Sequence, residues 1–285
     1  MTGEPLGSVI IAAHNESLVI KRCLDALAPG IETGQLDVIV VCNGCVDNTA
    51  EISRAATRIR VVELSQASKI AALRAGDEIA SAGPRIYLDA DVVMTARAAL
   101  DIMAALAGDS PLAGRPPVSF ESTGSQWPVR RWYRVRAQLP SIQNVLWGAG
   151  TYALSASGRA RFAEFPDIVS DDLFIDNLMA ERERVIVKTD PVIVRAPRRS
   201  ADLLKILKRT YRTQSDVPLR APTRRAVSSG QRGQLTDALN LIRRDPSQSF
   251  DVLLYVSLIA VARVQARLNT GGASWERDES SRTGT

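Results

Sequence analysis

The sequence is poor in cysteine and histidine. Its 285 residues include three cysteines, Cys23, Cys42 and Cys45, and one histidine, His14. So few cysteines exclude a fold that depends on disulfides. Cys42 and Cys45 form a C-x-x-C pattern, but a zinc site would need two further soft ligands, and the chain has only one other cysteine and one histidine. We therefore expect reduced thiols in a cytosolic compartment, without a zinc or redox role.

The start of the sequence and its longest apolar stretch bear on targeting and membrane insertion. No basic segment followed by an apolar run opens it, so we expect no signal peptide and a cytoplasmic location. The apolar stretch at 252–262 is interrupted only by Ser257 and is shorter than the ~20 residues that a membrane span needs. This stretch predicts a helix that docks on the domain, on a partner or shallowly on a bilayer, for example at the inner face of the cell membrane.

The composition, 45% hydrophobic and 24% charged, is typical of a soluble globular protein. The length allows one large α/β domain or one domain with a small appendage. The net charge is +5, and its excess is local: between residues 195 and 232, eleven lysines and arginines face only Asp202 and Asp216. This segment should attract phosphates or an anionic membrane surface, and we expect no nucleic-acid partner.

Short apolar runs and helical segments alternate in the first part of the chain. The runs are mostly β-branched and predict buried strands at 8–13, 37–41, 60–64 and 85–88. The segments between them have helical spacing, at 17–27, 48–56 and 69–82. This alternation predicts an α/β fold with right-handed βαβ units and a Rossmann-like, mostly parallel sheet flanked by helices.

The later part of the chain has a different pattern. It predicts helices at 127–138, from Asp171, at 200–214, at 234–244 and at 250–268, with strands at 185–188 and 192–195. Prolines, serines and arginines between 215 and 233 indicate a mobile loop or linker, and the polar segment 269–285 indicates a disordered tail. The last two helices form a C-terminal helical extension at 234–268.

Polar side chains follow each of the four predicted strands, where ligands bind in such sheets. They are His14 and Glu16, then Asn43 and Asp47, then Lys69, then Asp89 and Asp91. Asp89 and Asp91 are two positions apart at a strand end, so their carboxylates can point to the same side and share one Mg²⁺ or Mn²⁺ ion. Such D-x-D triplets also occur by chance or as helix caps.

Four segments around these residues occur in a fixed order. They read I-I-A-A-H-N-E at 10–16, V-V-C-N-G-C-V-D-N-T at 40–49, K-I-A-A-L-R-A-G at 69–76 and Y-L-D-A-D at 87–91. This ordered set resembles the inverting glycosyltransferases of family two, which have the GT-A fold, and the resemblance covers about residues 8–214. It implies a catalytic domain at 1–214 that transfers a sugar from a UDP- or GDP-sugar to an acceptor hydroxyl with Mn²⁺ or Mg²⁺.

The resemblance assigns a donor pocket, with Asp89 and Asp91 holding the cation. Four further residues would line the nucleotide, namely Ala12, Glu16, Asn43 and Lys69. Asn43 stands where the family usually has aspartate, and its amide can hydrogen-bond the edge of uracil or guanine. Asp47 matches the family's later acid, or else it is a charge that stabilises a helix N-terminus. His14 is interpreted as structural or as lining the pocket.

The resemblance also assigns an acceptor side. V-S-D-D-L-F-I-D at 169–176 resembles the family's acidic pair, with Asp172 as the general base and Asp171 as a positioning residue. The same acids can simply open a helix. Gly148 and Gly150 resemble the small-residue segment of the acceptor site, or form a turn.

The basic segment K-R-T-Y-R at 208–212 resembles the basic-aromatic motif near the end of the family's catalytic domain. Arg209, Tyr211 and Arg212 would then clamp the diphosphate or pack on the acceptor, or else they form a solvated basic helix face. The acceptor is a glycan, a lipid-linked molecule or a small molecule, and both a peripheral membrane contact and a homodimer stay open.

Two other classes of function compete with this one. A nucleotidyltransferase that makes sugar nucleotides shares the sheet, but it would be expected to have a Gly-rich, basic loop after the first strand, and A-A-H-N-E lacks one. A non-catalytic sugar- or membrane-binding module on the same scaffold is the other alternative. Turnover of a nucleotide-sugar would distinguish an enzyme from such a module.

Overall fold

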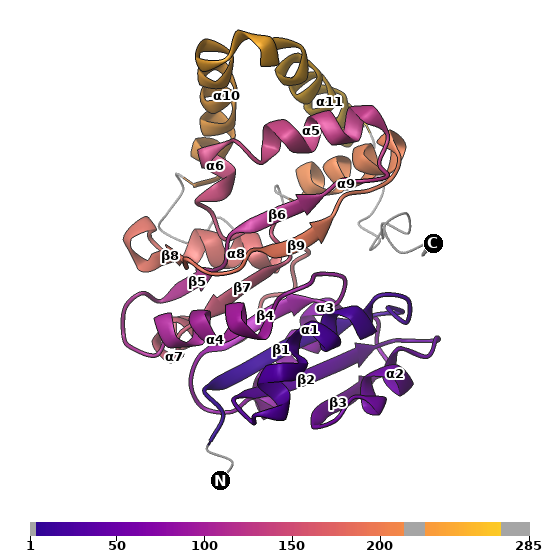
Figure 1. The fold of residues 1–285 in the computed structure, drawn as a ribbon, viewed down its shortest axis with the longest axis vertical. Helices are drawn as coiled ribbons and strands as arrows, with labels where there is room; N and C mark the ends of the chain where they lie inside the picture. The colour runs from indigo at the N-terminus through magenta and orange to yellow at the C-terminus, as the bar shows by residue number, and fades with distance from the viewer. Residues whose placement is uncertain (1–3, 214–225, 269–285) are drawn as a thin grey trace. The chain divides into compact units, whose positions relative to one another are not determined.

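The computed structural model describes residues 4–213 and 226–268 and divides the chain into two compact units (Figure 1). Unit 1 consists of Met1–Val118, Leu146–Asp167 and Met179–Val194. Unit 2 consists of Ser119–Val145, Ile168–Leu178 and Arg195–Thr285. The domain boundaries expected at 214 and 233 stay predictions, because the linker falls largely outside the described residues, and so does the whole of the expected tail.

Unit 1 is built on a seven-stranded sheet with the strand order β3-β2-β1-β4-β7-β5-β8. Strands β1, β2, β3 and β4 are all parallel, β7 is antiparallel to β4 and β5, and β8 is parallel to β5. The strands are β1 (Gly7–Ala13), β2 (Leu36–Asn43), β3 (Ile59–Leu64), β4 (Arg85–Asp89), β5 (Ala113–Arg115), β7 (Thr151–Leu154) and β8 (Arg184–Ile186). The predicted mostly parallel α/β sheet is therefore confirmed.

Helices cover both faces of this sheet. A Cβ atom on Gly7 of β1 would lie 3.3 Å from Met103 Sδ of α4, and a Cβ atom on Gly76 of α3 would lie 2.4 Å from Ile10 Cγ2 of β1. Positions 7 and 10 of a strand point to opposite faces, so α3 and α4 pack on opposite sides. Helix α1 contacts both α2 and α4. The helices of unit 1 are α1 (Ile20–Glu32), α2 (Thr49–Ala55), α3 (Lys69–Ile79), α4 (Ala96–Ala105) and α7 (Ala156–Arg159), with a 3₁₀ turn, η1 (Glu181–Glu183).

The first helix differs from its prediction at 17–27. It begins at Ile20, after a turn in which the Ile20 N–H donates to the Glu16 carbonyl oxygen and the Ser17 N–H donates to the Asp47 carboxylate. It then continues through Pro29 to Glu32. Proline removes one helical hydrogen bond, but the buried stripe of Leu27 and Ile31 continues across it, which is why the helix does not end there.

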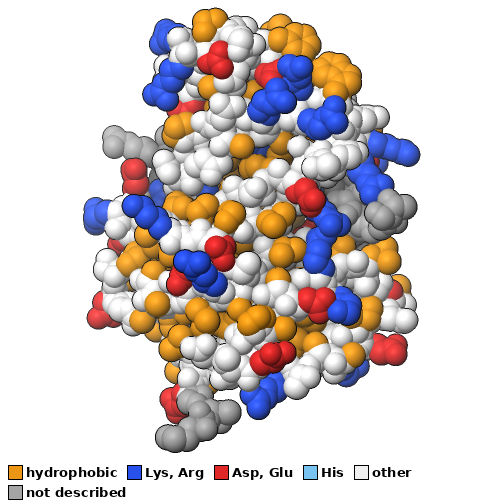
Figure 2. Space-filling view, in the orientation of Figure 1, with side chains coloured by type: hydrophobic (Ala, Val, Ile, Leu, Met, Phe, Trp, Pro, Cys, Tyr) orange, Lys and Arg blue, Asp and Glu red, His pale blue; other side chains and the backbone are white. Residues whose placement is uncertain are grey.

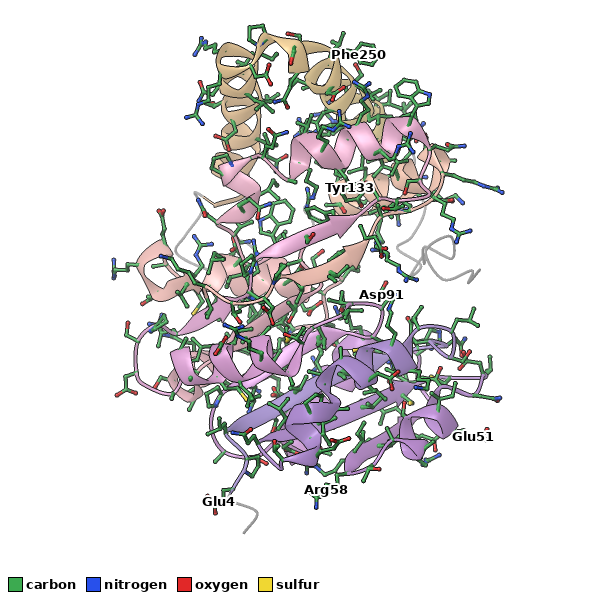
Figure 3. All side chains as sticks on the ribbon, viewed as in Figure 1. Glu4, Glu51, Arg58, Asp91, Tyr133 and Phe250 are labelled. Atoms are coloured by element: carbon green, nitrogen blue, oxygen red, sulfur yellow. The ribbon has the colours of Figure 1, made fainter. Side chains whose placement is uncertain are left out.

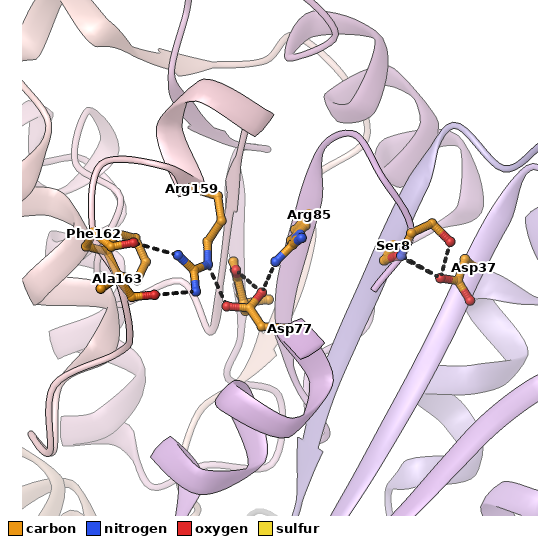
Figure 4. A network of polar contacts seen from close by, with 9 residues as sticks. Ser8, Asp37, Asp77, Arg85, Arg159, Phe162 and Ala163 are labelled. Carbon is orange, nitrogen blue, oxygen red and sulfur yellow. Dashed lines mark hydrogen bonds and ion pairs between the residues drawn. The ribbon is translucent and has the colours of Figure 1, made fainter. Parts of the chain in front are cut away.

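Asp77 organises the interior between α3 and the sheet. Its carboxylate accepts hydrogen bonds from the Tyr87 hydroxyl at 2.7 Å, from Arg85 at 2.7 Å and from Arg159 at 2.6 Å (Figure 4). The Asp77 side chain is only 5% exposed, and those of both arginines are largely buried. Burial, together with the charge of Asp77, raises the pKa of Tyr87 well above its usual value. This network ties α3, β4 and α7 together.

Unit 2 is mainly helical. Its helices are α5 (Trp127–Arg136), α6 (Pro140–Gln143), α8 (Asp171–Leu178), α9 (Ser200–Thr213), α10 (Ala226–Arg244) and α11 (Ser249–Leu268), with a 3₁₀ turn, η2 (Pro246–Gln248). Strands β6 (Val118–Glu121) and β9 (Val192–Arg195) pair in a two-stranded sheet at the points where the chain passes from one unit to the other. Helix α10 begins eight residues before the position predicted from the sequence.

Helix α11 is docked within unit 2 by one of its sides, where it contacts α5 and α9. Asp251 is 3% exposed and accepts hydrogen bonds from Arg131 and Arg134 of α5, and the ring of Tyr255 stacks on Trp132 with centroids 5.2 Å apart. The apolar helix is longer than the stretch expected from the sequence. Residues Pro246–Leu268 are long and apolar enough to cross a membrane by length and composition, which corrects the expectation that the segment is too short.

We expect Asp77→Ala to lower the free energy of unfolding by about 3–5 kcal/mol, because it leaves the guanidinium groups of Arg85 and Arg159 without their shared counter-charge. Urea denaturation followed by circular dichroism measures this change. The matched control is Asp25→Ala in α1. It removes the exposed ion-pair partner of Lys21, which lies one turn earlier in α1, and should change the unfolding free energy little. Equal losses in the two variants would contradict the central role of Asp77.

Candidate functional site

The carboxyl ends of the parallel strands of unit 1 gather six of the residues singled out in the sequence. We call this group the sheet-edge cluster, and it consists of Ala12, Glu16, Asn43, Lys69, Asp89 and Asp91. The register of the sheet places Ala12 of β1 directly beside Asp89 of β4, so the two side chains are on the same face. That face also carries Ile10, which packs against α3, and Lys69 is the first residue of α3. The fold thus brings the ends of β1 and β4 and the start of α3 together.

Asp89 is the best-defined member of the sheet-edge cluster. Its Oδ1 atom lies 2.7 Å from the Lys69 ammonium group, and its backbone N–H donates to the carbonyl oxygen of Gly150 at 2.8 Å. The Asp89 side chain remains 40% exposed. Lys69 is held in place because Ser68 caps α3, with its hydroxyl accepting the N–H of Ala71. A carboxylate fixed on one side and open on the other can accept a cationic ligand.

Asp91 lies on the loop that follows β4 (Figure 3). Its carbonyl oxygen accepts a hydrogen bond of 3.0 Å from the guanidinium group of Arg22, which comes from α1. Burial raises the pKa of the Cys23 thiol in α1 to about 12, and the charges of Asp91, Asp89 and Glu16 add to this effect, whereas Arg22 opposes it. Three carboxylates of the cluster therefore act on one buried point.

Asn43 ends β2 and is 1% exposed. Its Nδ2 atom donates to the carbonyl oxygen of Ala13 at 2.9 Å, whereas its Oδ1 atom is buried without a hydrogen-bond partner among the described residues. The His14 ring is 8% exposed, and its Nδ1 atom must carry the proton that it donates to the Asn43 carbonyl oxygen. The contacts of His14 support a structural role, whereas Asn43 has an acceptor atom left to use.

Glu16 and Asp47 shape the loops after β1 and β2. The Glu16 side chain is buried, its backbone N–H donates to Thr49 Oγ1 at 2.7 Å, and its carbonyl oxygen accepts the N–H of Ile20. The Asp47 carboxylate accepts hydrogen bonds from the backbone N–H groups of Ser17 and Thr49. Burial opposes the ionisation of Asp47, but hydrogen bonds from Thr49 and Ser17 outweigh it and lower its pKa. These contacts favour the structural interpretation of Asp47.

Gly150 packs closely against Asp89 and Val92 and does not leave an open space beside them. Its φ angle of +66° is in the left-handed region, and a Cβ atom there would lie 2.4 Å from Val92 Cγ2 and 3.3 Å from Asp89 Oδ2. Gly148 also has a positive φ angle, +75°. The segment therefore forms a tight turn, and its second glycine packs against the end of β4.

The acidic pair of unit 2 opens α8. The carbonyl oxygen of Ser170 accepts the N–H of Phe174, and an Asp172 oxygen lies 2.8 Å from the N–H of Leu173. Asp171 is 2% exposed, whereas Asp172 is half-buried. The helix-opening interpretation therefore applies to both acids, and Asp172 is the more accessible of the two.

The basic residues at the end of α9 are half-buried in unit 2. Arg263 of α11 stacks over the ring of Tyr211 at 4.8 Å, and burial raises the pKa of the Tyr211 hydroxyl. Arg209 and Arg212 are in the same turn of α9. Tyr211 thus packs within its own unit, which corrects the idea that all three residues project from a solvated face.

The C-x-x-C pair lies in the turn after β2. Neither cysteine forms a disulfide. The Cys45 thiol lies 3.5 Å from the carbonyl oxygen of Ala13 and accepts the N–H of Asn15. Burial is the main cause that raises the pKa of both thiols, that of Cys42 to about 12. These groups tie the first two loops together as neutral thiols.

The sheet-edge cluster can hold a divalent cation only if substrate or water supplies further ligands to the ion. Among the residues that the structure describes, no group of three or more His, Cys, Asp or Glu side chains is arranged to hold a metal ion. Mg²⁺-type cations are commonly bound by one or two carboxylates and complete their shell with substrate phosphates and water. The exposed carboxylate of Asp89 and the following Asp91 fit this second arrangement.

Sequence reasoning missed one contributor to the site, Arg22, and it did not foresee that Gly150, expected on the acceptor side, contacts Asp89. Arg22 reaches the loop of Asp91 from α1, and no motif marks an arginine in that helix. Gly150 contacts Asp89 from a segment 61 residues later, although its glycine-rich sequence had already marked a turn. Both contacts depend on tertiary packing.

The chain is similar in fold to solved structures that are distant from it in sequence. The mannosyltransferase PcManGT from Pyrobaculum calidifontis, solved in complex with GDP-Man and Mn²⁺, has 16% identity and a TM-score of 0.62, covering 92% of this chain and 88% of that one. TarS 1-349 from S. aureus in complex with UDP has 13% identity and a TM-score of 0.51, covering 92% and 91%. At such identities the likeness shows the fold alone.

The comparison with sequence families is more specific. No curated protein sequence matches this chain. Residues 8–163, more than half of the chain, match the family described as glycosyl transferase family 2. That range contains the whole sheet-edge cluster and Gly150. The chain therefore belongs to glycosyl transferase family 2, and it is a glycosyltransferase with the GT-A fold.

Proposed function

We propose that this enzyme transfers a sugar from a UDP- or GDP-sugar to an acceptor hydroxyl, with a divalent cation and with inversion at the anomeric carbon. The observation that carries the proposal is the position of Asp89. It ends β4 beside Ala12, is paired with Lys69, and has a partly exposed side chain next to the turn of Gly150. The fold relative PcManGT was solved with GDP-Man and Mn²⁺, which supports a donor of this kind.

Asp89 and Asp91 would hold the cation, Mn²⁺ or Mg²⁺. When bound, such a cation neutralises charge that develops on the leaving diphosphate. Lys69 adds a fixed positive charge at the same edge, where it orients Asp89 and attracts phosphate oxygens. Ala12, with its small side chain, leaves room beside Asp89 for the donor.

Asn43 and Glu16 would bind the nucleoside. The buried Asn43 Oδ1 atom can accept an N–H group, and uracil and guanine each present one on the base edge. A buried acceptor that gains a donor is stabilised, because an unsatisfied buried polar group is costly. This role works equally for UDP and GDP, so the base of the donor stays open.

Asp172 would act as the general base. An acceptor hydroxyl that attacks the anomeric carbon must lose its proton, and the carboxylate accepts it as the new C–O bond forms and the bond to the diphosphate breaks. Attack from the side opposite the leaving group inverts the configuration. Asp171 is buried and would position Asp172 rather than react.

The remaining assignments concern the acceptor and the location. Gly148 and Gly150 would border the acceptor site, and Arg209 and Arg212 would contact the diphosphate or an anionic acceptor. A glycan, a lipid-linked molecule and a small molecule are all compatible acceptors. We place the enzyme in the cytoplasm at the inner face of the membrane, because unit 2 is basic and carries the apolar helix α11.

We expect Asp91→Ala to reduce the Mn²⁺-dependent release of UDP or GDP from a nucleotide-sugar by at least about a hundredfold. The reason is that the cation supplies several kcal/mol of stabilisation to the departing diphosphate. Free nucleotide is measured with and without Mn²⁺, and Asp25→Ala on the exposed side of α1 is the control. Release that is unaffected by both the substitution and a chelator would overturn the cation assignment.

Asp172→Asn should bind the donor as tightly as the natural enzyme, yet transfer to an acceptor should fall by about 10²–10⁴-fold, the usual contribution of a general base. Calorimetry with Mn²⁺ measures donor binding, and a panel of glycans, lipid-linked and small-molecule alcohols supplies the acceptor. The control is Asp202→Asn, which also removes an acid from the first turn of a helix in unit 2. Unchanged transfer by Asp172→Asn would remove the base assignment.

Gly150→Ala should weaken Mn²⁺-dependent donor binding by about tenfold, equivalent to ~1.4 kcal/mol. The added methyl group meets Val92 and the Asp89 carboxylate. The matched control is Gly124→Ala, which places alanine at a similar positive φ angle, +83°, but meets no atom within 4 Å. Both variants should lose some stability through backbone strain, and only Gly150→Ala should lose donor affinity. Equal binding by both variants would show that Gly150 does not support Asp89.

A further inference from the structure

Helix α11 has two apolar sides, although only one of them is packed. The packed side carries Asp251, Val252, Tyr255, Ile259 and Ala262. The opposite side carries an exposed row at spacings of three, four and one, namely Phe250, Leu253, Ser257, Ala260, Val261, Val264 and Leu268. Only Ser257 in this row is polar. We call this row the outer stripe of α11.

The outer stripe is unusual for a surface in water. Its large side chains are 44–79% exposed, from Val261 to Leu268, and only 28% of the apolar stretch of this helix is buried. At the N-terminal end, Trp127 of α5 is 52% exposed and stacks on Phe250 with centroids 6.2 Å apart. Contiguous exposed apolar groups of this kind mark a surface that binds something apolar. Trp side chains with one apolar side and one wet side are enriched at membrane interfaces.

Arginines surround the N-terminal end of the outer stripe. The Arg131 guanidinium lies over the Phe250 ring at 5.8 Å, and Arg131 and Arg134 share the single charge of Asp251. Arg243 and Arg244 are exposed in the last turn of α10, shortly before α11 begins. Figure 2 shows basic and apolar side chains interleaved over α5 and α11. Asp245 follows Arg244 in the sequence, and its carboxylate accepts hydrogen bonds from the side chains of Ser247 and Gln248.

The charge of the two units argues for an anionic occupant. Unit 2 contains 21 lysines and arginines against 12 acids, whereas unit 1 contains 15 against 19. The chain's net positive charge therefore comes entirely from the unit that carries the outer stripe. A second copy of the chain would bring two strongly basic units together, which is unfavourable. An anionic bilayer offers both the negative charge and the apolar interior.

We propose that the outer stripe of α11, with Trp127 and the arginines around Phe250, is a membrane-docking surface that lies in the interface of an anionic lipid bilayer. The helix docks by its outer side while its inner side stays packed on α5 and α9. Trp127, Phe250 and Leu253 enter the acyl boundary, and Arg131, Arg134, Arg243 and Arg244 contact lipid phosphates. This inference rests on the membrane location proposed above, and it is independent of the cation and base assignments.

The packing of α11 distinguishes docking from spanning. A spanning helix would have to leave unit 2 and take the buried Asp251 carboxylate with it into hydrocarbon. Asp251 instead holds the helix to α5 through two arginines. The helix therefore lies along the surface of its unit, with its outer side available to a bilayer.

The test is co-sedimentation of the full chain with vesicles of phosphatidylcholine alone and with vesicles in which about a third of the lipid is phosphatidylglycerol. We expect clear binding to the anionic vesicles only. Phe250→Ser combined with Leu253→Ser should weaken this binding at least about tenfold. Arg243→Gln combined with Arg244→Gln should weaken it by more than about tenfold, at roughly fivefold for each charge.

The matched control is Leu6→Ser combined with Ile79→Ser, which removes two exposed apolar side chains from unit 1 and should leave vesicle binding unchanged. Thermal unfolding and Mn²⁺-dependent donor binding of each variant show whether it is folded. Asp91→Ala should bind vesicles like the natural chain, so a failed reaction mechanism and a failed docking surface give different results.

Several outcomes would overturn the proposal. Equal binding to neutral and anionic vesicles removes the role of the arginines. Binding that resists about 1 M salt, where charges are screened beyond ~3 Å, combined with resistance to carbonate extraction, indicates a spanning helix. No vesicle binding, with a dimer in sedimentation velocity that Phe250→Ser and Leu253→Ser convert to a monomer, assigns the outer stripe to a second copy of the chain.

Discussion

The parallel pairing of β1 with both β2 and β4 is the constraint on which the site depends. It places the ends of three strands at one edge of the sheet and fixes Ala12 beside Asp89. Because parallel strands require crossover helices, the same pairing brings the start of α3, with Lys69, to that edge. The buried Asp77 network then locks α3 against β4 and keeps Lys69 and Asp89 in register. The chemistry of the edge follows from this geometry.

The local patterns of the sequence predicted this part of the fold well. Apolar β-branched runs located β1 to β4 within two residues at each end, because such runs are typical of parallel strands. The polar residues at their ends were identified for the same reason. The expectation that all four strands are buried is wrong for β3, which lies at the edge of the sheet and has no buried residue. The antiparallel strand β7, which pairs with β4, was not predicted, because Thr151–Leu154 is short and its signal was that of a glycine-rich turn.

Contacts between distant segments could not be predicted from the sequence. Arg22 reaches Asp91 across 69 positions, and Arg131 reaches Asp251 across 120, so no local spacing reveals either pair. The same limit applies to α11, whose two apolar sides look alike in the sequence. Only packing shows which side is buried, and the exposed side together with the basic charge of unit 2 then becomes informative. The two units thus contribute different physical properties, an acidic sheet edge and a basic, partly apolar helical surface.

The central claim is that Asp89 and Asp91 bind a divalent cation together with the diphosphate of the donor. A crystal structure of the chain with Mn²⁺ and UDP or GDP, recorded at the manganese absorption edge, tests it directly. We predict an anomalous peak ~2.1 Å from carboxylate oxygens of Asp89 or Asp91 and from diphosphate oxygens, with the base near Asn43. A nucleotide bound elsewhere, or a cation peak away from both acids, would contradict this account.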